Sequence, residues 1–166
     1  MRVVLFVMMT AAILQAQAPS FDQSRAKDAF KGKPAAPQLR TAFARNFGTA
    51  IREGAERGPN FAGRFAIVRW GCGSECVQMA VVDENSGAVY RGPFATLAFS
   101  LSLIWHGNGP QADRFEPVSF RLDSRLPVVR GCPEEDQRNC ALFYYEWDGK
   151  KFRLLHKFTP PPPPVF

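Results

Sequence analysis

The sequence contains few of the residues that bind metals and redox cofactors. Its 166 residues include two histidines and four cysteines. Three residues separate Cys72 from Cys76 and seven separate Cys132 from Cys140, whereas zinc sites favour two-residue gaps and thiol redox sites use Cys-x-x-Cys. The acidic segment 134–136 lacks the regular ligand spacing of an EF-hand. We therefore expect no metal site and no cofactor.

Apolar runs long enough to span a bilayer are also missing. The apolar stretch 3–14 is shorter than the roughly 20 residues that a transmembrane helix needs. It follows Arg2 and precedes small residues, an order typical of a secretory signal peptide. We expect residues 1–18 to be a signal peptide that is cut after Ala16 or Ala18. The mature chain would then be periplasmic or secreted, with no transmembrane segment.

The sequence shows no catalytic constellation. A Ser–His–Asp triad needs a histidine held between two partners, and each histidine here has a plainer explanation. His156 lies in a predicted strand, where it would be partly buried, and His106 lies in a predicted loop. We assign no catalytic residue and favour a protein that is not an enzyme, with a small hydrolase using His106 or paired carboxylates as an alternative. The candidate carboxylates are Glu75, Asp83, Asp123 and Glu146.

Positive charge is concentrated near the beginning of the chain, whose formal net charge is +6. Residues 19–57 contain eight Lys and Arg against four Asp and Glu, and residues 58–166 contain twelve against eleven. Nucleic acid is the usual partner of a basic protein, but an exported chain meets lipid headgroups, polysaccharides and acidic proteins instead. We therefore expect a protein or an anionic envelope component as partner, and no nucleic acid. The segment 19–36, interrupted by Gly32 and Pro34, is predicted to be a flexible basic arm.

One amphipathic helix is predicted from residue 37 onward. Pro37 suits a first helical turn, where no backbone donor is needed. Gly54 and the pair Gly58-Pro59 supply the stop. Apolar residues recur every four positions and form one stripe, which is expected to pack on the core. The stripe comprises Leu39, Phe43, Phe47 and Ile51.

The rest of the chain alternates with the two-residue period of strands. The turn Asp148-Gly149 predicts a hairpin between the last two strands. The fold class is therefore α+β, with the helix packed on a twisted antiparallel sheet of about six to eight strands. A single domain over 37–158 would end in the proline-rich tail 159–166. Strands are predicted at 65–70, 77–83, 88–90, 97–103, 118–122, 126–130, 141–147 and 151–158.

The cysteines occupy corresponding places in two similar units. In each unit a strand and a Gly-Cys pair precede a loop, and a second cysteine opens the next strand. Four cysteines allow three pairings, of which this pattern favours Cys72 with Cys76 and Cys132 with Cys140. Such short loops add only about 2 to 2.6 kcal/mol each in the chain-entropy model. The disulfides would therefore serve mainly to clamp two hairpin loops.

Two rigid loops and many aromatic residues favour a binding module over an enzyme. The leading hypothesis is an exported inhibitor or immunity-type protein that acts on an envelope-active enzyme through these loops. A further alternative is an envelope-associated structural protein held by its basic arm. Candidate residues of the binding surface are Trp70, Glu75, Arg130, Arg138, Tyr144 and Glu146.

Three short segments carry a resemblance to other proteins. They are Gly-Pro-Asn-Phe-Ala-Gly at 58–63, Trp-Gly-Cys-Gly at 70–73 and Tyr-Tyr-Glu-Trp-Asp-Gly at 144–149. With them the chain resembles a group of uncharacterised bacterial secreted proteins over roughly residues 40–155. The resemblance implies export and brings no activity. In size and compartment the chain is also similar to periplasmic lysozyme inhibitors, without their inhibitory-loop motif.

Overall fold

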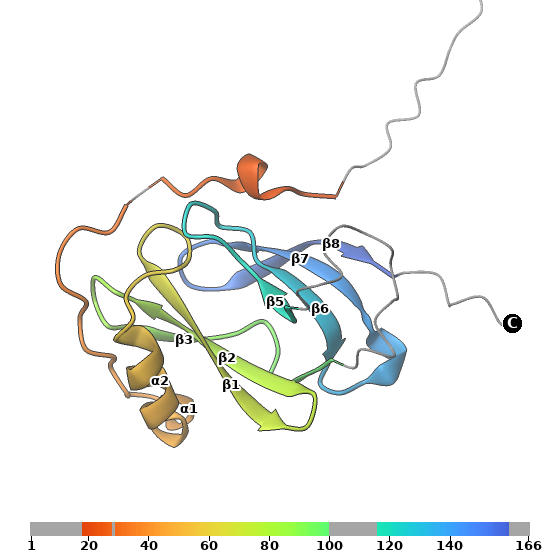
Figure 1. The fold of residues 1–166 in the computed structure, drawn as a ribbon, viewed down its shortest axis with the longest axis horizontal. Coiled ribbons are helices and arrows are strands. Elements are labelled where there is room, and N and C mark those ends of the chain that lie inside the picture. The colour runs from red at the N-terminus through yellow and green to blue at the C-terminus, as the bar shows by residue number, and fades with distance from the viewer. Residues whose placement is uncertain (1–17, 28, 100–115, 160–166) are drawn as a thin grey trace, which may run out of the picture.

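A computed structural model describes residues 18–27, 29–99 and 116–159. Within these residues, eight strands form one antiparallel sheet with the order β1-β2-β4-β6-β7-β8, while β3 pairs with β2 and β5 with β6 (Figure 1). This confirms the predicted antiparallel sheet. The strands are β1 (Phe65–Gly73), β2 (Cys76–Asp83), β3 (Val89–Arg91), β4 (Leu97–Ala98), β5 (Val118–Ser119), β6 (Val128–Pro133), β7 (Ala141–Trp147) and β8 (Phe152–Phe158). The helices are α1 (Ala42–Asn46) and α2 (Gly48–Ala55), with short 3-10 turns η1 (Phe21–Ser24) and η2 (Gln137–Asn139).

The continuous helix predicted from Pro37 is wrong. The chain is not helical before Thr41, whose hydroxyl oxygen accepts a hydrogen bond from the N–H of Ala44 and so begins α1. The helix breaks at Phe47 (φ −110°, ψ 20°), and α2 starts at the next residue. That residue is Gly48, where a Cβ would lie 2.7 Å from the side chain of Leu39. The first member of the apolar stripe, Leu39, therefore lies outside the helices, in a turn that the hydrogen bond from Arg40 N to the carbonyl oxygen of Gln38 closes.

Both helices cover one face of β1 and β2. Ile51 and Ala55 of α2 are buried against alternate residues of the two strands, Ala66, Val68, Ala80 and Val82. The contact at Gly54 is close, because a Cβ there would lie 2.3 Å from Cγ1 of Val68. This small second core holds the helices on the outside of the sheet.

The main core lies on the other face of β1 and β2. Residues of β1 and β2 pack there with residues of β6 and β7, so the curved sheet encloses its own core. Trp147 is almost fully buried at the centre. Its ring lies 4.7 Å from Phe152, 5.4 Å from Phe65 and Tyr90 and 6.5 Å from Phe61 (centroid to centroid). Strands far apart in the sequence are thus joined through one aromatic cluster.

Several strands differ in extent from their predicted ranges. The ones expected at 97–103 and 118–122 pair for only two residues each, and part of the first range lies outside the described residues. The strand expected from residue 126 begins at Val128. Pro127 precedes it and has no backbone N–H to donate to a neighbouring strand. β7 has the predicted bounds, and β8 begins one residue later than expected.

The described residues of the arm predicted at 19–36 are hydrogen-bonded to the domain. The arm runs over the top of the molecule in Figure 1 and then down to α1. The hydroxyl oxygen of the fully buried Ser124 lies 2.9 Å and 3.2 Å from the carbonyl oxygens of Phe21 and Ser24. Further backbone hydrogen bonds join Ala26 to Asp123, Phe30 to Gly63, Ala35 to Glu84 and, just beyond the arm, Gln38 to Gly87.

These contacts involve the backbone of the arm, while the side chains of Lys27, Lys31 and Lys33 are exposed, so the hypothesis of a structural protein held by its basic arm stays a prediction. The predicted signal peptide, apart from Ala18, and the tail beyond Thr159 lie outside the described residues. In the part of the chain that the structure describes, no helix has the length and apolar character to cross a membrane.

Candidate binding site

Each disulfide closes a connection between two neighbouring antiparallel strands. Cys72 is joined to Cys76 at the end of the β1–β2 hairpin, with Cα atoms 5.1 Å apart. Cys132 is joined to Cys140 between β6 and β7, with Cα atoms 4.0 Å apart. Both pairs are local, so each disulfide constrains one loop and leaves the overall topology to the sheet and its core.

The two loops lie at the same end of the sheet. Ala98 of β4 pairs with Cys76 on one side and with Cys132 on the other. Close to this point Gly131 adopts a φ of +153°, and a Cβ there would lie 2.5 Å from the carbonyl oxygen of Ala98. A residue with a side chain would push β4 away from β6. We call this region, formed by residues 72–76, 95–99 and 132–140, the disulfide end.

Three glutamates at the disulfide end have left-handed backbone conformations. Their φ angles are 51° at Glu75, 55° at Glu134 and 59° at Glu135. Such a conformation costs a residue other than glycine about 1 kcal/mol or more. The loops are held by hydrogen bonds from Phe99 N to the carbonyl oxygen of Glu75 and from Glu134 N to that of Thr96, both 2.8 Å long. The acidic side chains are therefore presented on ordered loops.

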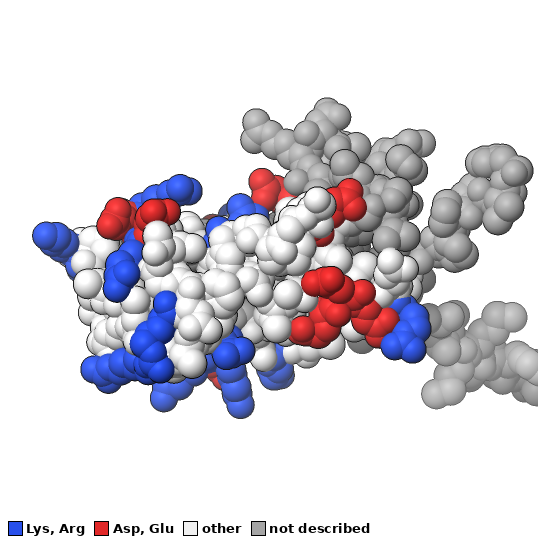
Figure 2. Space-filling model, turned by 90° about the horizontal axis from the view of Figure 1, so that it is seen from below, with Lys and Arg blue, Asp and Glu red and all other residues white. Residues whose placement is uncertain are grey.

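The exposed side chains of this end include one basic group. The guanidinium of Arg138 is paired with Asp136, with Nε 2.9 Å from Oδ1. These hydrogen bonds from Arg138 lower the pKa of the Asp136 carboxyl. In Figure 2, a group of acidic side chains with a basic one beside it lies toward one end of the face shown, and basic side chains predominate toward the other end, where acidic ones also occur. The end that carries both disulfides is thus rich in carboxylates.

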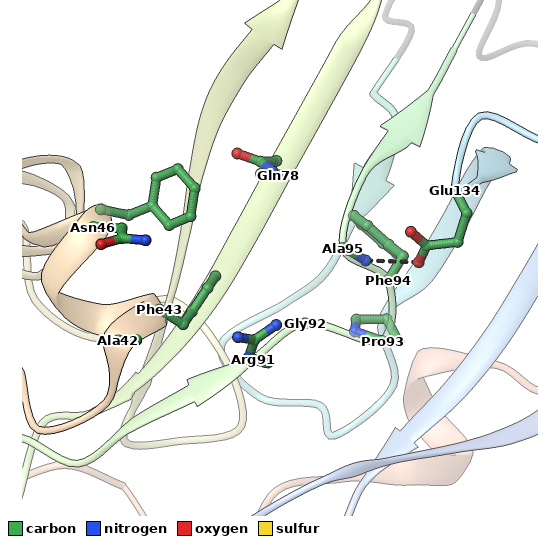
Figure 3. A pocket seen from close by; sticks show the side chains of 11 residues that line it. Ala42, Phe43, Asn46, Gln78, Arg91, Gly92, Pro93, Phe94, Ala95 and Glu134 are labelled. Carbon is green, nitrogen blue, oxygen red and sulfur yellow. Dashed lines mark hydrogen bonds between the residues drawn. The ribbon is translucent and has the colours of Figure 1, made fainter.

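A pocket of about 400 Å³ opens between the disulfide end and the helices (Figure 3). Phe43 and Asn46 of α1 lie on one side of it, and Ala95 and Glu134 lie on the other, with Arg91 between them. A carboxylate oxygen of Glu134 accepts a hydrogen bond of 2.8 Å from the backbone N–H of Ala95. The second disulfide loop therefore supplies one wall of the pocket.

The polar groups of this pocket are held by aromatic neighbours. The guanidinium carbon of Arg91 lies 4.6 Å from the ring centroid of Phe43. Gln78 of β2 accepts a hydrogen bond of 2.9 Å from the indole N–H of Trp70. An apolar surface with a few oriented polar groups is typical of small-ligand sites. The pocket thus combines a guanidinium, a carboxylate and two amides with phenylalanine walls.

The structure divides the six predicted surface residues into three groups. Glu75 and Arg138 are exposed at the disulfide end. The ring of Trp70 instead packs 4.9 Å from that of Phe47 in the contact between helix and sheet, so it is no exposed anchor. The remaining three, Arg130, Tyr144 and Glu146, lie on β6 and β7 and do not line the pocket.

The strands β7 and β8 give two of these residues structural partners. Glu146 forms ion pairs with Arg125 and Arg153. The ring of Tyr144 lies 5.7 Å from that of His156 on the neighbouring strand. His156 itself is half-buried. These side chains stabilise the outer strands and are not brought together with the disulfide loops.

The structure offers little support for the hydrolase. Three of the four candidate carboxylates are ion-paired with arginines, as in the pairs Asp83–Arg64 and Asp123–Arg121. The hydrogen bond from Arg121 lowers the pKa of the Asp123 carboxyl. His106 lies outside the described residues. Within the described ranges, no three His, Cys, Asp or Glu side chains are arranged to hold a metal ion.

The sequence does not predict the buried carboxyl group of Glu84. Glu84 follows β2 and is fully buried, and neither of its carboxylate oxygens has a hydrogen-bond partner. Burial, with a smaller contribution from the charge of Asp83, raises the pKa of Glu84 to about 7. The sequence gives no signal for this burial, because Glu84 stands at the start of a polar turn.

Arg91 and Gln78 were also missed as site residues, and Phe43 was expected only as a core residue of the helix. The one local signal at Arg91 is the Gly92-Pro93 pair that follows it and ends β3. A Cβ at Gly92 would lie 2.5 Å from the side chain of Met79, so the chain passes close to the core there.

The chain matches no protein family, no curated protein and no solved structure.

Proposed function

We propose that this protein is an exported binding module that recognises a protein partner through the disulfide end and the adjoining pocket. Its concrete form is an inhibitor or immunity-type protein directed at an envelope-active enzyme. One observation carries the proposal. Both disulfide loops flank β4, and Glu134 of one loop forms a wall of the pocket.

The physical argument concerns preorganisation. A loop that is ordered before binding loses less conformational entropy when the complex forms. Here the disulfides and the hydrogen bonds to residues 95–99 hold Glu75, Glu134 and Glu135 in conformations that these residues rarely adopt. Their carboxylates suit a partner with a basic surface, because complementary charge gives specificity and fast association.

The test uses the purified protein as an immobilised bait in envelope extract. The double variant Glu75→Gln/Glu135→Gln removes two carboxylates from the loops. The control Glu53→Gln/Glu56→Gln makes the same change in charge at the carboxyl end of α2. Any protein retained by the wild type is then purified, and its affinity and enzymatic activity are measured with each variant.

We expect the wild type and the control to bind the same enzyme and to lower its activity. The loop variant should bind at least about tenfold more weakly, because close charge pairs at interfaces are worth more than 1.4 kcal/mol. Retention of no enzyme, or equal affinity of the loop variant and the control, would contradict the proposal.

A further inference from the structure

A second pocket, of about 450 Å³, lies on the other side of Arg91. It shares Arg91 and Phe43 with the first pocket and is completed by Tyr90 of β3 and by Lys150, Lys151 and Phe152 from the β7–β8 turn and the start of β8. Three segments that are distant in the sequence therefore meet around it. The disulfide loops contribute nothing to this pocket.

The charged residues that line this pocket are all basic. Arg91, Lys150 and Lys151 are exposed, and no Asp or Glu is among the lining residues. Other arginines pair with carboxylates, as in Arg69 with Glu116. Among the described residues, by contrast, no ion pair joins these three cations to a carboxylate, although both lysines attract the nearby carboxylate of Asp148. They thus form a local concentration of positive charge.

The nearest acid along the chain is used to shape the turn. The carboxylate of Asp148 accepts hydrogen bonds from the backbone N–H groups of Lys150 (2.8 Å) and Lys151 (2.9 Å). These bonds lower the pKa of the Asp148 carboxyl, so it remains an ionised acceptor. The turn places the backbone of both lysines at the pocket while their ammonium groups keep free donors.

The aromatic walls are fixed by the core. Phe152 and Tyr90 lie 4.7 Å and 5.4 Å from the buried ring of Trp147 (centroid to centroid). Phe43 carries the Arg91 guanidinium on its face. Both the flat apolar surfaces and one of the cations are therefore in place before any ligand arrives.

We propose that this pocket binds a small ligand in which a carboxylate or phosphate is attached to a flat, apolar ring. The anionic group would receive hydrogen bonds from Arg91 and the two lysines, which are strong because both partners are charged. The ring would lie against Phe43, Tyr90 and Phe152. This inference does not rest on the proposed function, because Lys150, Lys151 and Phe152 line only this pocket, although Arg91 and Phe43 line both.

Phenyl phosphate and benzoate are suitable probes, and their binding is followed by calorimetry and by amide shifts in NMR spectra. Benzyl alcohol controls for the ring alone, and inorganic phosphate controls for the charge alone. We expect at least one aryl anion to bind more tightly than both controls. Its affinity should decrease as the salt concentration is raised. Whichever of phenyl phosphate and benzoate has the higher affinity identifies the preferred anion. Failure of both aryl anions to bind up to about 10 mM would overturn the proposal.

The variants Lys150→Gln/Lys151→Gln and Arg91→Gln should each lower affinity for the better probe by about tenfold or more. Lys157→Gln removes one positive charge at the opposite end of β8 and should leave affinity unchanged. Thermal unfolding of each variant shows that it is folded. Equal affinity of the lysine double variant and the wild type would refute the site. The variant Glu75→Gln/Glu135→Gln should bind the probe normally, so this test can fail or succeed separately from that of the proposed function.

Discussion

Replacing Glu84 by Gln should make the protein more stable at neutral and alkaline pH. The carboxyl has a pKa of about 7 in the folded chain, against 4.5 without burial. Between these values the folded state holds more protons than the unfolded state, so the free energy of unfolding decreases as pH rises. The difference of about 2.5 pKa units corresponds to about 3 kcal/mol, because each unit is worth 1.36 kcal/mol. Gln has a similar shape and does not ionise.

The measurement is urea unfolding of both proteins, with their disulfides intact, from pH 4.5 to about pH 8. The stability of the variant minus that of the wild type should increase by about 3 kcal/mol over this range. The free-energy cost of burying the glutamine amide does not depend on pH, so it cancels when the values at the two pH limits are subtracted. Exposed Glu56→Gln serves as the control, with an expected effect within about 0.5 kcal/mol throughout. A difference between Glu84→Gln and the wild type that does not depend on pH would refute the reasoning.

Two further predictions concern packing. Ser124→Ala should lower the free energy of unfolding by about 1 to 3 kcal/mol, because buried backbone groups lose a hydrogen-bond partner. The same variant should be cleaved faster by a protease within the arm. Unchanged cleavage would show that the arm is held elsewhere. Gly54→Ala should destabilise by about 1 to 3 kcal/mol because its Cβ would meet a valine of β1. Gly71→Ala, with no atom within 4 Å of a new Cβ, should stay within about 0.5 kcal/mol of the wild type in chemical denaturation.

The strands were predictable because their signals are local. The unbroken apolar run from Phe65 to Val68 reflects two cores on opposite faces of β1, and the Asp148-Gly149 turn joins β7 to β8. Both features depend on residues that are neighbours along the chain. The same holds for the apolar stripe of α2, whose Ile51 packs where a period of four residues would place it.

The first helix boundary and the arm depend on distant partners. The chain before Thr41 is not helical, and its residue Gln38 bonds instead to a turn that lies about fifty residues later. The composition of the arm gives no sign of the buried Ser124 that receives it. Arg91 likewise becomes a pocket residue only when α1 and the β7–β8 turn are placed beside β3. The periodicity of the sequence gives no information about contacts between such distant segments.

The attachment of the arm has a consequence for the order in which the chain can fold. The carbonyl groups of Phe21 and Ser24 meet a hydroxyl that lies 103 and 100 residues further along the chain. During synthesis, the segment that contains Phe21 and Ser24 therefore cannot dock on Ser124 until about a hundred further residues have been made. Contacts between such distant residues form late and slowly, because a long loop must close first. A chain that ends before Ser124 therefore lacks the hydroxyl that holds Phe21 and Ser24, although the later part of the arm can already bond to Gly63 and Glu84.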